Sequence, residues 1–306
     1  MLIIEPKLPG KFSEITARFD KKTRLDDYPA NAYKYAELDK YSKKEVHEIA
    51  EDVLDKSRLS LETAQDKLWA SKKYGVLIVL QGMDTAGKDG TIRHVMSGVN
   101  PQGCRVQCFK TPTTEEHAHD FLWRYGKVLP ERGEIVIFNR SHYEDVLAVK
   151  VHPEYMEALP KELVDDCSPE FWQNRYQDIS AWERHLARNG VLVLKFFLHI
   201  SKNEQKRRLL ERIDIEEKNW KISPADLKER TFWDQYTTAF EDAITNTSRM
   251  FAPWIIVPAN DKKIARAIVA DVIAKAIDNL DIEYPEVSQA QKDSLQEARR
   301  QLESEQ

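Results

Sequence analysis

Five short apolar runs, separated from one another by stretches with helical character, constrain the fold of this chain more than any other feature. The runs are YGVLIVLQG at 74–82, RVQCF at 105–109, EIVIF at 134–138, VLVLKFFLHI at 191–200 and WIIVPAND at 254–261. Continuous apolar runs are typical of strands buried on both faces, and strands that alternate with helices form a parallel sheet. The sequence therefore predicts an α/β fold, with a five-stranded parallel sheet flanked by helices in three layers.

Helical spacing of apolar residues and capping residues mark the helices between these runs. They predict one or two amphipathic helices over 43–73, further helices over about 113–128 and 168–190, one from residue 201 onwards, and a closing helix over 262–280. Ser168 followed by Pro169 is typical of a helix start, because proline is tolerated at the first helical position. Ser201 and Glu204 have the spacing of a capping box.

The chain is predicted to contain one domain with an extension at each end. Residues 1–42 are expected to form an irregular N-terminal extension, because prolines at positions 6, 9 and 29 interrupt regular elements. The domain itself is predicted over 43–283. Residues 284–306 are polar and charged, and we expect a C-terminal tail that is either a helix on a partner or a frayed end.

The composition argues against several classes of protein. With 42% hydrophobic and 32% charged residues the chain is typical of a soluble globular protein, and no apolar run approaches the roughly 20 residues of a membrane span. A net charge of −5 argues against a protein that coats nucleic acid, although a local cluster of cations could still bind a polyanion. Three cysteines without disulfide or metal-site spacing, and an N-terminus without a secretion signal, favour the cytoplasm. We therefore expect no nucleic-acid and no membrane partner.

The segment GMDTAGKDG at 82–90 follows the first apolar run directly. Gly82, Gly87 and Lys88 have the G-x-x-x-x-G-K spacing of a phosphate-binding loop, and a strand before it and a helix after it are the context that this motif requires. Backbone N–H groups and the lysine are expected to hold the phosphate. The expected phosphate-binding residues are Gly82, Met83, Thr85, Ala86, Gly87, Lys88, Asp89 and Gly90, with Arg93 further along the helix.

Asp89 stands where a phosphate-binding loop normally has the Ser or Thr hydroxyl that holds Mg²⁺. Because Mg²⁺ commonly takes one or two carboxylates together with water and phosphate oxygens, an acid elsewhere could replace the hydroxyl. Asp84 lies inside the loop and is expected to be either a metal ligand or a base that orients the acceptor. Asp89 is expected to position the helix start, where a negative charge is favourable.

The end of the run 134–138 is the second place where a metal ligand is expected, since enzymes of this type usually have an aspartate there. This chain has Asn139, which can hydrogen-bond a metal-bound water but supplies no charge, and then Arg140, whose forked cation suits a phosphate. Glu144 follows five residues after Asn139 and could return a carboxylate to the site. The sequence therefore predicts Mg²⁺, or Mn²⁺ in its place, held by Asp84 and Glu144. The alternative for Glu144 is a solvated acid in the first turn of a helix.

A cation-rich segment, KNEQKRRLLERIDIEEKNWK at 202–221, follows the fourth run. Arg208 and Arg212 lie four residues apart and share one helix face. A kinase with a phosphate-binding loop needs cations over the transferring phosphoryl group, so a helical lid is predicted over about 202–230, with Arg208 as its catalytic cation. The alternative is a solvated charged face. Further phosphate contacts are expected from Arg207, Arg212, Lys218 and Lys221.

Together these segments resemble the polyphosphate kinase 2 family, over roughly residues 40–280. The resemblance lies in GMDTAGKDG, in FNRSHYEDVL with VHPE after it, in KFFLHISKNEQKRRLLERI, in EKNWKIS and in PANDKKIARAIV. It implies a P-loop kinase fold and an enzyme that uses inorganic polyphosphate to phosphorylate nucleotides. The functional positions that it implies are Asp84, Lys88, Asn139, Arg140 and Arg208.

Asn139 with Glu144 is similar to the third class of that family, which accepts both AMP and ADP. The leading hypothesis is therefore Mg²⁺-dependent transfer of a phosphoryl group from polyphosphate to AMP or ADP, with polyphosphate synthesis from ATP as the reverse reaction. The resemblance also implies a homodimer or homotetramer. Two alternatives stay open: a nucleoside monophosphate kinase that uses ATP, and a nucleotide-binding regulatory protein without turnover.

Overall fold

The computed structural model describes residues 15–17, 21–35, 38–157, 159–164 and 167–305. Residues 1–14, which belong to the predicted N-terminal extension, lie outside this part. The described part of the extension contains the short 3₁₀ turns η2 (Leu25–Asp27), η3 (Ala32–Lys34) and η4 (Leu38–Lys40). Ile15 and Ala17 are buried, and the Ala17 amide donates a hydrogen bond to the Trp254 carbonyl, so this segment packs against the domain.

The predicted five-stranded parallel sheet is confirmed. Its strands are β1 (Gly75–Gln81), β2 (Cys104–Cys108), β3 (Ile135–Asn139), β4 (Val191–His199) and β5 (Trp254–Pro258). Their order is β2-β3-β1-β4-β5, and every pairing is parallel. The central strand β1 is buried along its whole length, as its continuous apolar run indicates. Because β3 and β4 lie on opposite sides of β1, the carboxyl end of β1 is a switch point of the kind at which α/β sheets bind ligands.

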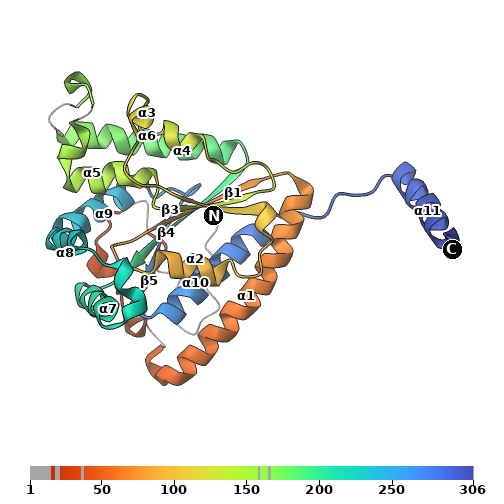
Figure 1. Cartoon of the computed structure of the whole chain (residues 1–306), viewed down its shortest axis with the longest axis horizontal. Helices are drawn as coiled ribbons and strands as arrows, with labels where there is room; N and C mark the ends of the chain where they lie inside the picture. Colours follow the sequence, from red (N-terminus) through yellow and green to blue (C-terminus); the bar gives the residue numbers. More distant parts are fainter. Residues whose placement is uncertain (1–14, 18–20, 36–37, 158, 165–166, 306) are drawn as a thin grey trace.

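Helices cover both faces of the sheet, which gives the three expected layers (Figure 1). One layer holds α1, α2 and α10, and α1 packs along α10. The other layer holds α6 and α9 together with the short helices α3, α4 and α5. The helices are α1 (Lys43–Ser71), α2 (Lys88–Val95), α3 (Thr114–His117), α4 (Trp123–Gly126), α5 (Ala148–Val151), α6 (Pro169–Arg188), α7 (Lys202–Asp214), α8 (Pro224–Thr231), α9 (Trp233–Thr247), α10 (Lys262–Asp278) and α11 (Gln289–Ser304).

Most predicted helices agree with the structure, and one differs. The segment 43–73 holds a single helix, α1, which begins at a capping box between Ser42 and Glu45. The continuous helix predicted over about 113–128 is wrong, because α3 and α4 are separate single turns. Between them the Asp120 carboxylate accepts a hydrogen bond from the Leu122 amide, and such local bonds compete with helical hydrogen bonding.

The C-terminal residues form a helix, α11, in which all described side chains are exposed. Figure 1 shows this helix standing away from the domain, at the end of an extended segment. Within the described part of the chain, none of the helices is both long and apolar enough to cross a membrane.

Candidate active site

The phosphate-binding loop joins β1 to α2, at the switch point of the sheet. Gly87 precedes α2 with a φ of 105°, a left-handed conformation that side chains disfavour. A Cβ at Gly82 would lie 2.9 Å from the Leu198 carbonyl oxygen of β4, so a larger residue would push the loop off the sheet. The backbone conformation at Gly87 and the close contact at Gly82 therefore explain why both positions of the motif are glycine.

Lys88 is the first residue of α2 and is folded back onto the loop. Its ammonium donates hydrogen bonds to the carbonyls of Gly82 at 2.8 Å and Met83 at 3.5 Å. Burial lowers the pKa of Lys88, and the neighbouring Arg140 cation acts in the same direction. An anion bound in the loop would be a stronger partner for this ammonium than neutral carbonyls are.

Arg140 brings the two predicted metal ligands together. Its guanidinium lies 3.1 Å from the Asp84 carboxylate and 3.6 Å from the Glu144 carboxylate, so one cation bridges an acid of the loop and an acid of the 3₁₀ helix η6 (His142–Val146). The pKa of Arg140 is raised, chiefly by Glu144 and also by Asp84. Arg140 has a φ of 63°, a conformation that is uncommon for residues other than glycine and that is enriched at functional sites. Glu144 is thus part of the charged cluster.

The donor atoms of this cluster fit a magnesium ion. Two carboxylates contact the same guanidinium beside the loop, and Mg²⁺ commonly uses one or two carboxylates with phosphate oxygens and water completing its shell. The described residues contain no group of three or more His, Cys, Asp or Glu side chains placed to hold a metal by themselves. Asp84 and Glu144 therefore suit an ion that arrives with a phosphate.

Asp89 and Asn139 form a contact that sequence reasoning missed. The Asn139 amide donates a 2.8 Å hydrogen bond to the Asp89 carboxylate, which joins the start of α2 to the end of β3. The register of the sheet explains the meeting, because Asn139 pairs with Leu80 near the end of β1. The two residues lie 50 positions apart in the sequence, and both depart from the usual pattern of such a site.

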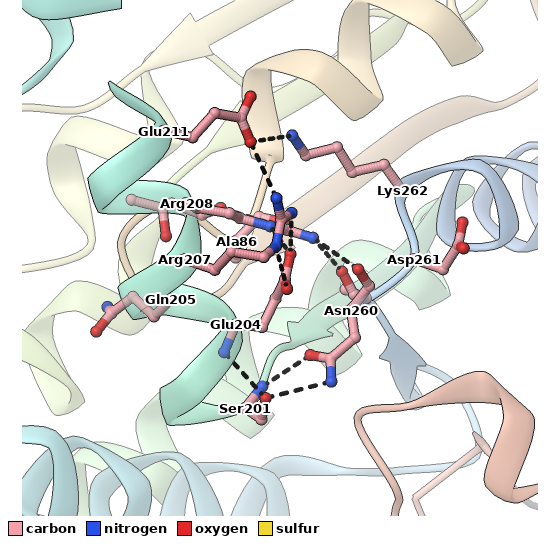
Figure 2. Close-up of polar contacts among 12 residues, drawn as sticks. Ala86, Ser201, Glu204, Gln205, Arg207, Arg208, Glu211, Asn260, Asp261 and Lys262 are labelled. Carbon is pink, nitrogen blue, oxygen red and sulfur yellow. Dashed lines mark hydrogen bonds and ion pairs between the residues drawn. The ribbon is translucent and has the colours of Figure 1, made fainter. Parts of the chain in front are cut away.

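Arg208 does not take the position predicted for it. Its side chain is 3% exposed and lies against the backbone of the loop at Ala86 (Figure 2). Its guanidinium donates hydrogen bonds to the carbonyls of Thr85 and Ala86, to two carbonyls of the segment after β5, and to Glu204. Sequence spacing identified the helix and the residue type, but it could not tell which face of α7 meets the loop.

Three of the other predicted cations of this region make their bonds within it. Arg207 binds Glu204 and Glu211, Lys218 binds Glu211, and Arg212 donates to the Lys221 carbonyl. The Glu204 carboxylate therefore pairs with arginines and does not complete the predicted capping box. The Ser201 side chain does cap α7. Among the described residues, no side-chain hydrogen bond or ion pair joins these lid cations, or Arg93, to the loop 82–90.

The turn η6, which carries Glu144, rests on a buried polar network that sequence reasoning also missed. Lys195 of β4 binds Glu183 of α6 at 2.6 Å, and both side chains are fully buried. Glu183 accepts hydrogen bonds from Tyr143 and pairs with His142, the two residues that precede Glu144. The lysine inside the apolar run 191–200 was the available signal, since a buried charge requires a partner.

Comparison with known proteins agrees with this geometry. The family model described as polyphosphate kinase 2 matches residues 40–285. The chain is 45% identical over 282 residues to an ADP-polyphosphate phosphotransferase of Rhodopseudomonas palustris, covering 92% of this chain and 95% of that protein. It is 47% identical over 226 residues to an AMP/ADP-polyphosphate phosphotransferase of Meiothermus ruber, covering 74% and 80%.

A solved structure is also similar. The crystal structure of a polyphosphate kinase 2 from Arthrobacter aurescens superposes with a TM-score of 0.82 at 34% sequence identity, covering 94% of this chain and 97% of that one.

Proposed function

The chain belongs to the polyphosphate kinase 2 family, and we propose that it transfers the terminal phosphoryl group of inorganic polyphosphate to AMP and ADP with the help of Mg²⁺. The observation that carries this proposal is the cluster of Asp84, Arg140 and Glu144 beside Lys88 of the phosphate-binding loop. The relatives named as AMP/ADP- and ADP-polyphosphate phosphotransferases support polyphosphate as the donor.

The charged cluster suits direct transfer between two phosphates. The loop amides and Lys88 bind the donor phosphate, and Arg140 stabilises the charge that develops on the transferring group. Asp84 and Glu144 would hold the metal and orient the acceptor. Bound Mg²⁺, or Mn²⁺ in its place, supplies positive charge that offsets the repulsion between the phosphates. Because the acceptor is already an anionic oxygen, positioning and electrostatics suffice without a strong general base. Polyphosphate synthesis from ATP follows the same path in reverse.

A panel of acceptors tests this proposal. AMP, ADP, GMP and GDP are each incubated with polyphosphate or with ATP as donor, and the products are separated by chromatography. We expect ADP from AMP and ATP from ADP with polyphosphate, and a lower rate with both acceptors in Glu144→Ala. Turnover with ATP alone would identify an ATP-dependent nucleoside monophosphate kinase, and binding without turnover would identify a regulatory protein.

Assembly and compartment belong to the same proposal. We infer a homodimer or homotetramer in the cytoplasm. Support for the compartment comes from Cys104 and Cys108, which are free thiols, as is usual in a reducing compartment. Light scattering on the purified protein would give the number of subunits.

A further inference from the structure

Three consecutive carbonyl groups of the phosphate-binding loop are held by side chains of α7. The Gln205 amide donates a 3.1 Å hydrogen bond to the Asp84 carbonyl. The Arg208 guanidinium donates to the Thr85 carbonyl at 3.0 Å and to the Ala86 carbonyl at 2.8 Å. Figure 2 shows Gln205 and Arg208 projecting from α7, with Ala86 beside the guanidinium. One helix therefore fixes the orientation of three neighbouring peptide groups.

The two preceding carbonyls of the loop are held as well. The Gly82 carbonyl accepts from Lys88 at 2.8 Å, and the Met83 carbonyl accepts from the Ala86 amide at 3.0 Å. The bond to Gly82 becomes weaker whenever Lys88 turns to an anion. The bonds from Gln205 and Arg208 do not depend on Lys88, so they can persist when phosphate is bound.

The two side chains of α7 are themselves fixed. Gln205 and Arg208 are each 3% exposed. The Gln205 side-chain oxygen accepts a 2.8 Å hydrogen bond from Arg230, which orients its amide nitrogen toward the loop. Glu204 accepts a 2.6 Å bond from the Arg208 side chain, and the remaining donors of that guanidinium bind carbonyls after β5. All the groups of Arg208 that could bind a phosphate are therefore occupied.

This arrangement matters because carbonyl oxygens repel anions and amide N–H groups attract them. In a planar trans peptide the C=O and the N–H point in opposite directions. Carbonyls of residues 84 and 86 that face α7 consequently turn the amides of Thr85 and Gly87 to the other side, where they can bind an anion. Thr85 has a φ of 66°, a conformation that persists only when its surroundings impose it.

We propose that Gln205 and Arg208 are positioning residues, which hold the loop in its anion-binding conformation and so make the affinity for the phosphate donor depend on α7. The proposal deepens the proposed function and rests on it only in taking polyphosphate as the donor. It differs from a direct role of Arg208 as a cation over the transferring phosphate. A neutral side chain, Gln205, performs the same task, and it cannot contribute through charge.

Two substitutions separate positioning from charge. Gln205→Leu removes, at nearly constant size, the hydrogen bond to the Asp84 carbonyl and the bond from Arg230 that orients it. We expect it to weaken binding of inorganic tripolyphosphate about tenfold, as the loss of one buried bond to the loop would. Arg208→Lys keeps the positive charge but cannot reproduce a fork that serves four carbonyls. We expect it to weaken tripolyphosphate at least as much. Gln177→Leu and Arg184→Lys, on the exposed face of α6, are matched controls with no expected effect.

Calorimetry with tripolyphosphate and no nucleotide measures the affinity directly, and steady-state kinetics follow on the same samples. We expect a higher KM for polyphosphate, an unchanged KM for AMP, and faster hydrogen exchange of the loop amides in Gln205→Leu. Unchanged tripolyphosphate affinity in folded Gln205→Leu, or wild-type affinity in Arg208→Lys, would overturn the proposal. A variant with a lower Tm but unchanged affinity and exchange would also overturn it, because that pattern is a purely structural effect.

The proposal and the proposed function fail in different ways. If the wild-type protein does not transfer phosphate from polyphosphate, the proposed function fails, while binding and exchange still test the loop. If Arg208→Lys does not fold, Gln205→Leu carries the test alone.

Discussion

The side-chain amide of Asn139 donates a 2.8 Å hydrogen bond to the carboxylate of Asp89. In a common phosphate-binding site the loop position has a hydroxyl and the strand position has an aspartate, and both hold Mg²⁺. Here the acid stands in the loop and the neutral side chain stands on the strand. The pair therefore keeps one carboxylate, with the two positions exchanged.

This exchange predicts the behaviour of a double variant. Asn139→Asp places two carboxylates in contact, and Asp89→Ser removes the one carboxylate of this pair. Each single change should therefore lower kcat at least tenfold, which corresponds to an increase of roughly 1.4 kcal/mol in the activation free energy. Asp89→Ser combined with Asn139→Asp restores the common arrangement and should recover much of that loss, with a coupling energy of about 1 kcal/mol or more. Initial rates of ADP formation, measured for the wild type and all three variants at several Mg²⁺ concentrations, give this coupling energy. Strictly additive losses would show that the two positions do not act as a pair.

The carboxylates bridged by Arg140 predict the metal dependence. Asp84→Asn and Glu144→Gln each remove one anionic ligand, so the Mg²⁺ concentration for half-maximal activity should rise about tenfold. Binding of Mn²⁺, followed by electron paramagnetic resonance, provides a reading that does not depend on turnover. Asp55→Asn, on the exposed side of α1, serves as the control. Metal binding that is equal in all four proteins would refute the assignment of Asp84 and Glu144.

The buried pair of Lys195 and Glu183 predicts a strong effect on stability. Lys195→Met leaves the Glu183 carboxylate buried without its cation, which should cost about 3–5 kcal/mol in the free energy of unfolding. Lys195→Met with Glu183→Leu removes both charges and should recover part of this loss, although His142 and Tyr143 then lose their acceptor. Denaturant unfolding of the wild-type protein and of these two variants gives the values. A single variant as stable as the wild-type protein would contradict the predicted cost.

His199 predicts a loss of stability in acid. Burial lowers the pKa of His199 to about 4, while its ring donates to the Tyr28 carbonyl. The unfolded chain therefore takes up the proton first, so the stability from neutral His199 is complete above pH 6.5 and is lost as the pH falls toward 4. Between pH 7 and pH 5 this residue should account for about 2 kcal/mol. His199→Asn keeps a donor for Tyr28 without the titration. The difference between wild type and variant in unfolding free energy should change by that amount, and a constant difference would contradict it.

The strands of this protein could be predicted from its sequence, whereas many of its side-chain contacts could not. Apolar runs identified all five strands. The run of the central strand β1 is continuous and buried, which leaves few alternatives, whereas the edge strand β2 is only partly buried. The segment 113–128 was assigned to one helix because its apolar spacing was compatible with one, whereas the local bond at Asp120 ends the pattern.

Within the site, residue types were predicted better than their partners. The charged cluster of Asp84, Arg140 and Glu144 follows from strand ends that meet at one edge of the sheet. The burial of Arg208 could not be predicted, because spacing along α7 defines its faces but not which of them packs on the loop. Lys195 shows the same limit, since its partner Glu183 comes from a helix face that only the tertiary structure brings close.

The most direct test of the central claim is phosphorus NMR of the purified protein with AMP, Mg²⁺ and polyphosphate in the complete absence of ATP. The account predicts that the β-phosphate signal of ADP appears, followed by ATP, while polyphosphate is consumed in equal amount. An unchanged spectrum, together with ADP formation once ATP is supplied in place of polyphosphate, would contradict it.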